Sequence, residues 1–310
     1  MKKLPTVTIG IPAYNEEENI NFALRSVLSQ KQDIWRLEDI IVVLDGSTDG
    51  TKRIVSSFQR NNRKIKVITG VKRLGKVERL NTIFKNSKSD LLFLLDADVV
   101  IGSTSTITKL VRAFNKRKNL QVAAAEQVAI LQTSLVGKIN TVGFTIWYRL
   151  LKSYRKGNNI HMLMGSATML RREFYTKFRY PKNLATDQHY LYVKATLDNR
   201  SNFDFIGNTN ILFRMPSTLA DARKQGTRAI FDDKDVLVKV FSTSIKKEYS
   251  IPLILKVKTT IWAIKKYPIL FPMNILLGVF IRLFPYEKKH NKQLWYAISS
   301  SKGAIIWMNS

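Results

Sequence analysis

LLFLLDAD, at residues 91–98, is a run of five apolar residues that ends in two carboxylates. A run so short and so apolar predicts a strand that is buried on both faces of a sheet. Because alternate residues of an extended chain share a face, Asp96 and Asp98 could both reach one cation. Mg²⁺ is commonly held by one or two carboxylates together with substrate phosphates, and it would stabilise a diphosphate leaving group. The pattern alone also fits a simple capped turn.

Similar apolar runs precede this one, and each is followed by a segment with helical spacing. The predicted strands are residues 7–11, 39–44, 65–68 and 90–95, and the predicted helices between them are residues 20–30, 51–58 and 77–86. This alternation predicts βαβ units and an α/β fold with a mostly parallel sheet and helices on both faces. Ligands of such sheets bind at the carboxyl ends of the strands, so the loops after these strands are the candidate site.

The second half of the chain is less regular. Further helices are predicted at residues 106–115, 187–197 and 221–240, an extended or mixed segment at 122–132, and long amphipathic stretches at 135–154 and 251–284. The longest uncharged apolar stretch, residues 267–281, has 15 residues. A membrane-spanning helix needs about 20, so an interfacial or re-entrant segment is expected instead of a span.

The charge of the chain is its unusual bulk property. Lys and Arg total 51 against 23 Asp and Glu, a net charge of +28 over 310 residues. Such a surface attracts anions, which include nucleic acid, anionic lipid and phosphorylated ligands, although a lysine-rich codon bias would also raise the count. Cysteine is absent, which excludes disulfides, thiolate metal sites and cysteine nucleophiles. The N-terminus lacks the apolar region of a signal peptide, so a cytoplasmic location is expected.

Two loops after predicted strands carry candidate ligands for a nucleotide. Asp45 opens the turn at residues 45–50, where its carboxylate could accept a hydrogen bond from a base N–H. Ser47 and Asp49 in the same turn are better explained as caps of the next helix. Arg73 and Lys76 flank a glycine after the third strand, a pattern that suits a phosphate but also occurs on solvated surfaces.

Two later segments carry candidate groups for the transfer step. Asp187 opens a predicted helix, where it is either an N-cap or a general base for an acceptor hydroxyl. Gln225 and Arg228 follow basic residues, and Arg228 could bind a diphosphate while Gln225 touches the acceptor. An ordinary exposed helix face is the alternative for this pair.

Taken together, these pieces resemble family 2 glycosyltransferases of the GT-A (Rossmann-like) fold. Seven segments in the family's order carry the resemblance, which spans about residues 6–230: VTIGIPAYNEE at 7–17, DGSTDGT at 45–51, RLGK at 73–76 with Leu80-Asn81, DAD at 96–98, GSATMLRR at 165–172, Asp187, and QGTR at 225–228.

The resemblance implies a role for each matching residue. Pro12, Ala13, Tyr14 and Glu16 would line the nucleotide pocket, Asp45 would read the base (usually uracil), and Arg73 and Lys76 would lie near the nucleotide. Asp96 would face the sugar and ribose and share with Asp98 a site for Mg²⁺ or Mn²⁺, and Asp187 would be the catalytic base. Gln225 and Arg228 match the Gln-x-x-Arg-Trp signature of membrane-bound polysaccharide synthases.

Two positions depart from the family pattern. Ala229 replaces the tryptophan of the signature, which normally offers a stacking face to the acceptor sugar, so processive polymerisation is not expected. Thr186 stands where many relatives carry an acidic residue, which weakens the assignment of the neighbouring base.

We therefore expect a catalytic domain at residues 1–230 and a basic, amphipathic helical region at 231–310. The second region would either lie on an anionic membrane surface, peripheral on its inner face, or pack on the catalytic domain. The predicted activity is inverting, metal-assisted transfer of a sugar from a nucleotide-diphosphate sugar, with UDP favoured by the resemblance, to a saccharide or lipid-linked acceptor.

Two other functions remain as alternatives. A sugar nucleotidyltransferase would share the sheet and a metal carboxylate, but it needs a glycine-rich basic loop after the first strand, where this chain has Glu16, Glu17 and Glu18. A basic nucleic-acid-binding protein would explain the charge but not the acidic residues at strand ends. No specific nucleic acid is therefore expected as a partner.

Overall fold

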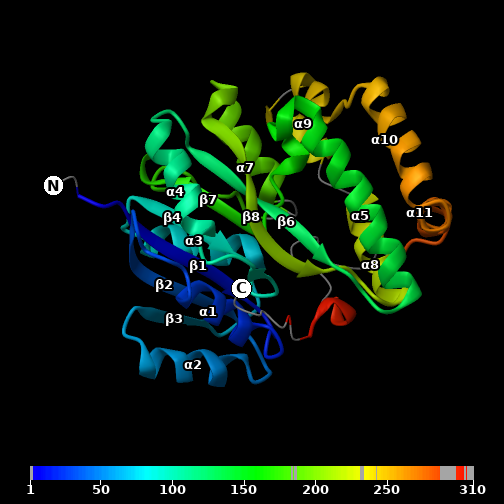
Figure 1. Cartoon of the computed structure of the whole chain (residues 1–310). Coiled ribbons are helices and arrows are strands. Elements are labelled where there is room, and N and C mark those ends of the chain that lie inside the picture. Colours follow the sequence, from blue (N-terminus) through cyan, green and yellow to red (C-terminus); the bar gives the residue numbers. More distant parts are fainter. Residues whose placement is uncertain are drawn as a thin grey trace.

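A computed structural model describes residues 3–182, 184, 187–230, 234–241, 243–286, 298–303 and 305 of the chain. Its centre is a mixed sheet with the strand order β3-β2-β1-β4-β7-β6-β8-β5 (Figure 1). The described strands are β1 (Thr6–Ala13), β2 (Arg36–Asp45), β3 (Ile65–Gly70), β4 (Leu91–Leu95), β5 (Val100–Ile101), β6 (Val122–Ile130), β7 (Ala167–Arg171) and β8 (Phe203–Arg214). β1, β2, β3 and β4 are mutually parallel, as are β6 and β8, whereas β7 and β5 run antiparallel to their neighbours.

Helices cover both faces of this sheet. They are α1 (Ile20–Leu28), α2 (Thr51–Asn61), α3 (Lys76–Asn86), α4 (Thr106–Lys116), α5 (Leu135–Ser153), α6 (Arg172–Tyr175), α7 (Asp187–Thr196), α8 (Leu219–Ile230), α9 (Lys234–Phe241), α10 (Leu253–Lys266) and α11 (Leu270–Leu283). The predicted α/β class, with a mixed and mostly parallel sheet, helices on both faces and helices at the C-terminal end, is therefore confirmed.

Alternation along β4 shows how the sheet builds two cores. Leu91, Phe93 and Leu95 pack with residues of α1, α2 and α4 on one face. Leu92 and Leu94 pack with residues of α3 and α7 on the other face. All five side chains are buried, as expected for a strand with helices on both sides. The apolar run at residues 91–95 therefore stands at the middle of both cores.

The sequence prediction missed three strands and merged two helices from residue 100 onward. The strands β5, β7 and β8 were not predicted, and the single helix expected at residues 221–240 corresponds to the two helices α8 and α9. β8 is hard to see because Asn208 and Asn210 have positive φ of 58° and 40°, and the pairing with β6 shifts register beside them. That irregularity interrupts the two-residue alternation on which a strand prediction depends.

The helix α11 packs on α5 and α8 at two glycines. A Cβ on Gly143 of α5 would lie 2.2 Å from Asn274 Nδ2 of α11, and one on Gly226 of α8 would lie 2.9 Å from the Ile281 side chain of α11. These glycines therefore let α11 approach α5 and α8 closely. α10 and α11 lie at the opposite end of the molecule from α2 and β3 (Figure 1). In the part of the chain that the structure describes, no helix is long and apolar enough to cross a membrane.

Candidate active site

A cavity of about 280 Å³ opens at the carboxyl ends of β1, β2 and β4. Eleven of the twelve residues singled out from the sequence line it: Pro12, Ala13, Tyr14, Glu16, Asp45, Arg73, Lys76, Asp96, Asp98, Gln225 and Arg228. Asp187, the twelfth, touches the lining residue Lys76 at 3.3 Å. The lining also includes residues that the sequence reasoning did not select: Gly75, Arg79, Ala97, Phe213, Arg214, Ile298, Ser301 and Lys302.

Asp45 holds the loop that follows β3. Its Oδ1 accepts hydrogen bonds from the Leu74 N–H at 2.8 Å and from Arg79 Nε at 2.6 Å, and its Oδ2 accepts one from the Gly75 N–H at 2.9 Å. Gly75 has a φ of 93°, a conformation that side chains rarely adopt. A carboxylate has about four acceptor positions, so Oδ2 retains one for a ligand.

Arg79 is a functional neighbour that the sequence reasoning missed. It lies on α3, its side chain is only 8% exposed, and its Nη2 also donates to the Lys72 carbonyl at 2.5 Å. The available signal was an arginine within the apolar pattern of the predicted helix at residues 77–86. A charged side chain buried on that face needs a counter-charge, and Asp45 supplies it.

Lys76 forms ion pairs with both Asp96 and Asp187. Its Nζ lies 2.8 Å from Asp96 Oδ1 and 3.3 Å from Asp187 Oδ2, and it donates to the Gly165 carbonyl at 3.2 Å. Burial lowers the pKa of Lys76, but Asp187 and Asp96 outweigh it and raise the pKa above its usual value. The ammonium therefore stays charged, and it holds two carboxylates from distant parts of the chain at one point.

The segment that leads to Asp187 is fixed by a side chain of α3. Asn81 Nδ2 donates to the Tyr180 carbonyl at 2.9 Å, and the Tyr180 N–H donates to Asn81 Oδ1 at 2.9 Å. At the start of α7, the Gly165 N–H donates to Gln188 Oε1 at 3.0 Å. These contacts position the buried Asp187 carboxylate beside Lys76. Thr186, the departure from the family pattern, lies outside the described residues.

Asp96 and Asp98 form the acidic corner at the end of β4. The Asp96 N–H donates to the carbonyl of Ser166, the residue before β7, at 2.8 Å, which fixes the backbone here. Burial raises the pKa of Asp96 to about 6, with Lys76 opposing the rise and Asp98 adding to it. Burial and then Asp98 raise the pKa of Glu16 to about 7, which Lys302 opposes. Glu16, Asp96 and Asp98 all line the cavity, so three carboxylates share this part of the site.

A divalent cation suits this corner only together with a ligand. Among the described residues, no group of three or more His, Asp and Glu side chains is arranged to hold a metal ion by itself. Asp96 and Asp98 offer the oxygen ligands that Mg²⁺ and Mn²⁺ accept, and Mg²⁺ usually completes its shell with substrate phosphates and water. The position of Glu16, Asp96 and Asp98 on one cavity is the observation that favours a cation here.

Hydrogen bonds join the loop after β1 to the loop after β2. Asn15 Nδ2 donates to Thr48 Oγ1 at 3.3 Å, and the Thr48 N–H donates back to Asn15 Oδ1 at 2.8 Å. Asp49 Oδ1 accepts from the Thr51 N–H at 3.0 Å, although the N-cap position of α2 is Gly50 and not Asp49. Above them, the Arg73 guanidinium lies 3.9 Å from the centre of the Tyr14 ring. The loops after β1, β2 and β3 therefore act as one wall.

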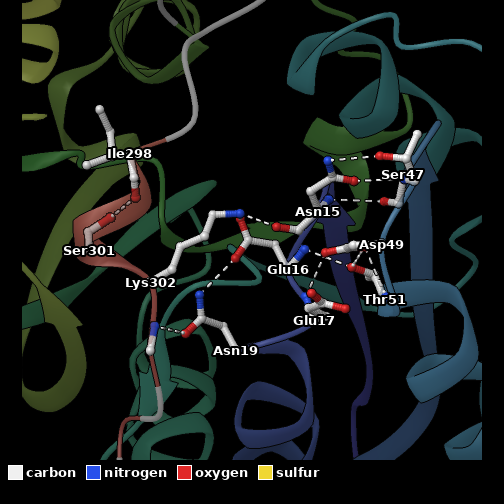
Figure 2. A network of polar contacts seen from close by, with 12 residues as sticks. Asn15, Glu16, Glu17, Asn19, Ser47, Asp49, Thr51, Ile298, Ser301 and Lys302 are labelled. Carbon is white, nitrogen blue, oxygen red and sulfur yellow. Dashed lines mark hydrogen bonds and ion pairs between the residues drawn. The ribbon is translucent and has the colours of Figure 1, made fainter.

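The C-terminal segment also reaches this wall, which the sequence reasoning did not anticipate. Lys302 Nζ lies 3.0 Å from Glu16 Oε1 and donates to the Asn15 carbonyl (Figure 2). Nothing in the local sequence marks Lys302, because it lies 287 positions from Asn15 in a stretch of ordinary polar residues. Gln225 and Arg228, on α8, face the same cavity.

The comparisons with known proteins agree with this geometry. The model of the family "Glycosyl transferase family 2" matches residues 8–179. This chain belongs to glycosyl transferase family 2. Both the resemblance inferred from the sequence and the expected enzyme class are thereby confirmed.

The curated relatives have low sequence identity to this chain or match only part of it. The chain is 24% identical over 247 residues to the poly-beta-1,6-N-acetyl-D-glucosamine synthase of Staphylococcus aureus strain N315, covering 79% of this chain and 58% of the relative. The Staphylococcus epidermidis protein of the same name is 30% identical over 138 residues, which cover 44% of this chain and 32% of that protein. The chain thus spans less than two thirds of the length of these relatives.

Solved structures show the same fold at low identity. The mannosyltransferase PcManGT from Pyrobaculum calidifontis, in complex with GDP-Man and Mn²⁺, matches with a TM-score of 0.58 at 16% identity, over 92% of this chain and 77% of that one. Glucosyl-3-phosphoglycerate synthase from Mycobacterium tuberculosis, in complex with Mn²⁺, UDP and phosphoglyceric acid, gives a TM-score of 0.51 at 16% identity over 75% and 78%.

Proposed function

We propose that the chain transfers a sugar from a nucleotide-diphosphate sugar to an acceptor hydroxyl, with inversion at the sugar carbon. The observation that carries this proposal is the position of Lys76, whose Nζ lies 2.8 Å from Asp96 and 3.3 Å from Asp187. Through this lysine, the carboxylate proposed as the base lies beside the corner proposed to hold the donor diphosphate. One cavity thus offers groups for both the leaving group and the attacking group.

The donor would lie across the wall formed by the loops after β1, β2 and β3. The acceptor position left on Asp45 Oδ2 suits a base N–H, and the Tyr14 ring with Arg73 above it offers an apolar and cationic surface to the nucleotide. Asp96 and Asp98 would hold Mg²⁺ or Mn²⁺, which neutralises diphosphate charge when bound. Arg228 on α8 would face the diphosphate from the other side.

Asp187 would act as the general base. It would take the proton of the acceptor hydroxyl while that oxygen forms a bond to the anomeric carbon and the bond to the donor phosphate breaks. The nucleoside diphosphate then leaves, and a single displacement inverts the sugar carbon. Lys76 would keep the Asp187 carboxylate oriented in the buried site. Asp96, a proposed metal ligand, also contacts Lys76, so the lysine would link the position of the donor to that of the base.

Two features favour this activity over the alternatives. The loop after β1 carries Glu16 and Glu17, whose charge disfavours the nucleoside triphosphate that a nucleotidyltransferase would bind there. The acidic groups of the site disfavour a nucleic-acid groove at this edge of the sheet. UDP-N-acetylglucosamine is the first donor to test, because staphylococcal relatives are named for that sugar, and GDP-mannose is the second because the Pyrobaculum structure contains it.

A membrane surface is proposed as the place of action. α10 and α11 keep large apolar side chains exposed, among them Leu253 at 74%, Leu276 at 67% and Leu283 at 68%. Residues 250–284 hold five Lys or Arg residues and no acidic residue. Exposed apolar side chains next to cations match an anionic lipid interface, in which apolar groups enter the headgroup boundary and cations meet the phosphates. We propose a peripheral enzyme on the inner face of the cell membrane, acting on a saccharide or lipid-linked acceptor.

Ala229, in place of the signature tryptophan, supports transfer of one or a few sugars in preference to a long polymer. The position lies on α8, one residue after Arg228. Without an aromatic face there, a growing chain has one stacking contact fewer to keep it bound between rounds. The length of the product formed in a transfer assay measures this directly.

The experiment is a transfer assay with radiolabelled UDP-N-acetylglucosamine and GDP-mannose on lipid and saccharide acceptors. Asp187→Asn keeps the size of the side chain but cannot accept the proton, so transfer should fall by about 10²–10⁴-fold while donor affinity changes little. Asp198→Asn, on an exposed carboxylate, is the matched control and should keep full activity. Transfer by Asp187→Asn at the unchanged rate would refute the assignment of the base.

A further inference from the structure

A short C-terminal segment, residues 298–303, crosses from one side of the cavity to the other. We call it the C-terminal strap. At its first end the Ser300 N–H donates to Asp221 Oδ2 at 2.7 Å, and the Ser217 N–H donates to Ser300 Oγ at 3.1 Å. Asp221 is buried and lies on α8, the helix that carries Gln225 and Arg228. The strap is therefore attached to α8, the helix that contributes Gln225 and Arg228 to the cavity.

The other end of the strap is fixed to the loop after β1. Lys302 Nζ lies 3.0 Å from Glu16 Oε1, and the Gly303 N–H donates to Asn19 Oδ1 at 3.2 Å (Figure 2). Ser300 and Lys302 are two residues apart, a step of at most about 7 Å, so the strap links both walls within one short span. Ile305, just beyond it, is buried at 1% exposure. Attachment on both sides makes the strap a part of the cavity.

Lys302 is placed to serve an anion in that cavity. Its side chain is 15% exposed and lines the cavity with Ile298 and Ser301. Glu16 Oε2 also accepts from Asn19 Nδ2 at 2.8 Å, so the carboxylate keeps a partner when the lysine turns away. Lys302 lines the same cavity as Asp96 and Asp98, the residues proposed to hold the diphosphate with a cation.

We propose that the C-terminal strap belongs to the donor site and that Lys302 binds the diphosphate of the nucleotide donor. The inference rests on the proposed function. Without donor, the ammonium is paired with Glu16; with donor, it exchanges that carboxylate for a phosphate oxygen, and Glu16 remains bonded to Asn19. A lysine ammonium has three N–H donors and a flexible stem, which suits such an exchange.

The test is isothermal titration of the full chain with UDP and with UMP in the presence of Mn²⁺, and the same pair of titrations with GDP and GMP. Lys302→Met should weaken diphosphate binding about tenfold, as expected for one charge-assisted hydrogen bond of about 1.4 kcal/mol, and monophosphate binding less than about threefold. Lys302→Arg should stay within about threefold of the unchanged chain, because it keeps the charge. Lys66→Met removes an exposed ion pair with Asp39 and is the matched control. Thermal unfolding shows that each variant is folded.

Each other outcome overturns the inference. Tighter diphosphate binding by Lys302→Met would mean that the lysine competes with the donor for the cavity and does not bind it. Equal weakening of diphosphate and monophosphate would make the lysine a purely structural group. Unchanged binding would remove the strap from the site while leaving the proposed function intact. Failure of the unchanged chain to bind any of the diphosphates would instead refute the donor site itself.

Discussion

The variant Arg79→Met tests whether the buried ion pair of Arg79 and Asp45 stabilises the wall formed by the loops after β1, β2 and β3. The two side chains are 8% and 6% exposed and 2.6 Å apart. Removing one partner of a buried ion pair costs about 3–5 kcal/mol, because the other charge is left without compensation. Asp45 would still accept two backbone hydrogen bonds, from Leu74 and Gly75, so we expect the lower end of that range, about 3 kcal/mol.

Urea unfolding followed by circular dichroism measures this loss. With a slope of about 3 kcal/mol per molar urea, the midpoint of Arg79→Met should fall by about 1 M. Lys66→Met breaks the ion pair with Asp39, in which Lys66 is 57% exposed, and should cost less than about 1 kcal/mol. Equal midpoints for the two variants would refute the view that Asp45 depends on a buried counter-charge.

The remaining predictions concern the C-terminal helices. Gly226→Val places a side chain against Ile281 of α11, and overpacking there should cost about 1–3 kcal/mol in thermal unfolding; Gly278→Val, whose Cβ meets only Arg282 Nη1 at 3.3 Å, should cost less. Equal losses would contradict close packing of α8 on α11. Replacing Leu276 and Leu283 by Ser should reduce flotation with phosphatidylglycerol vesicles without loss of stability, and unchanged flotation would refute the membrane surface.

The first half of the fold could be predicted from the sequence because its signals are local. Residues 91–95 and each of the earlier apolar runs predict a strand from their local sequence alone. The rule that ligands bind at the carboxyl ends of parallel strands was then enough to assign Asp45 and Asp96 to one edge of the sheet. The strand β7, although part of the family-like segment at 165–172, was missed because it has only five residues and four of them are buried, so it shows no two-residue alternation.

The site was less predictable where its contacts are long-range. The approach of Lys76 to Asp187 joins residues more than a hundred positions apart, and only the family resemblance suggested that both belong to one site. Arg79 and Lys302 had no such support. Arg79 was marked only by its place in the apolar pattern of α3, which does not identify its partner. Lys302 had no local mark, because its contacts with the loop after β1 depend on tertiary packing.

The central claim is that Asp96 and Asp98 hold a cation together with a nucleotide diphosphate. Titration calorimetry of the unchanged chain and of Asp98→Ala with UDP and with GDP, each with and without Mn²⁺, tests it most directly. Mn²⁺ should tighten nucleotide binding by the unchanged chain at least about tenfold, and Asp98→Ala should remove that gain while remaining folded. Nucleotide binding that ignores Mn²⁺, or a gain that survives in Asp98→Ala, would contradict the account.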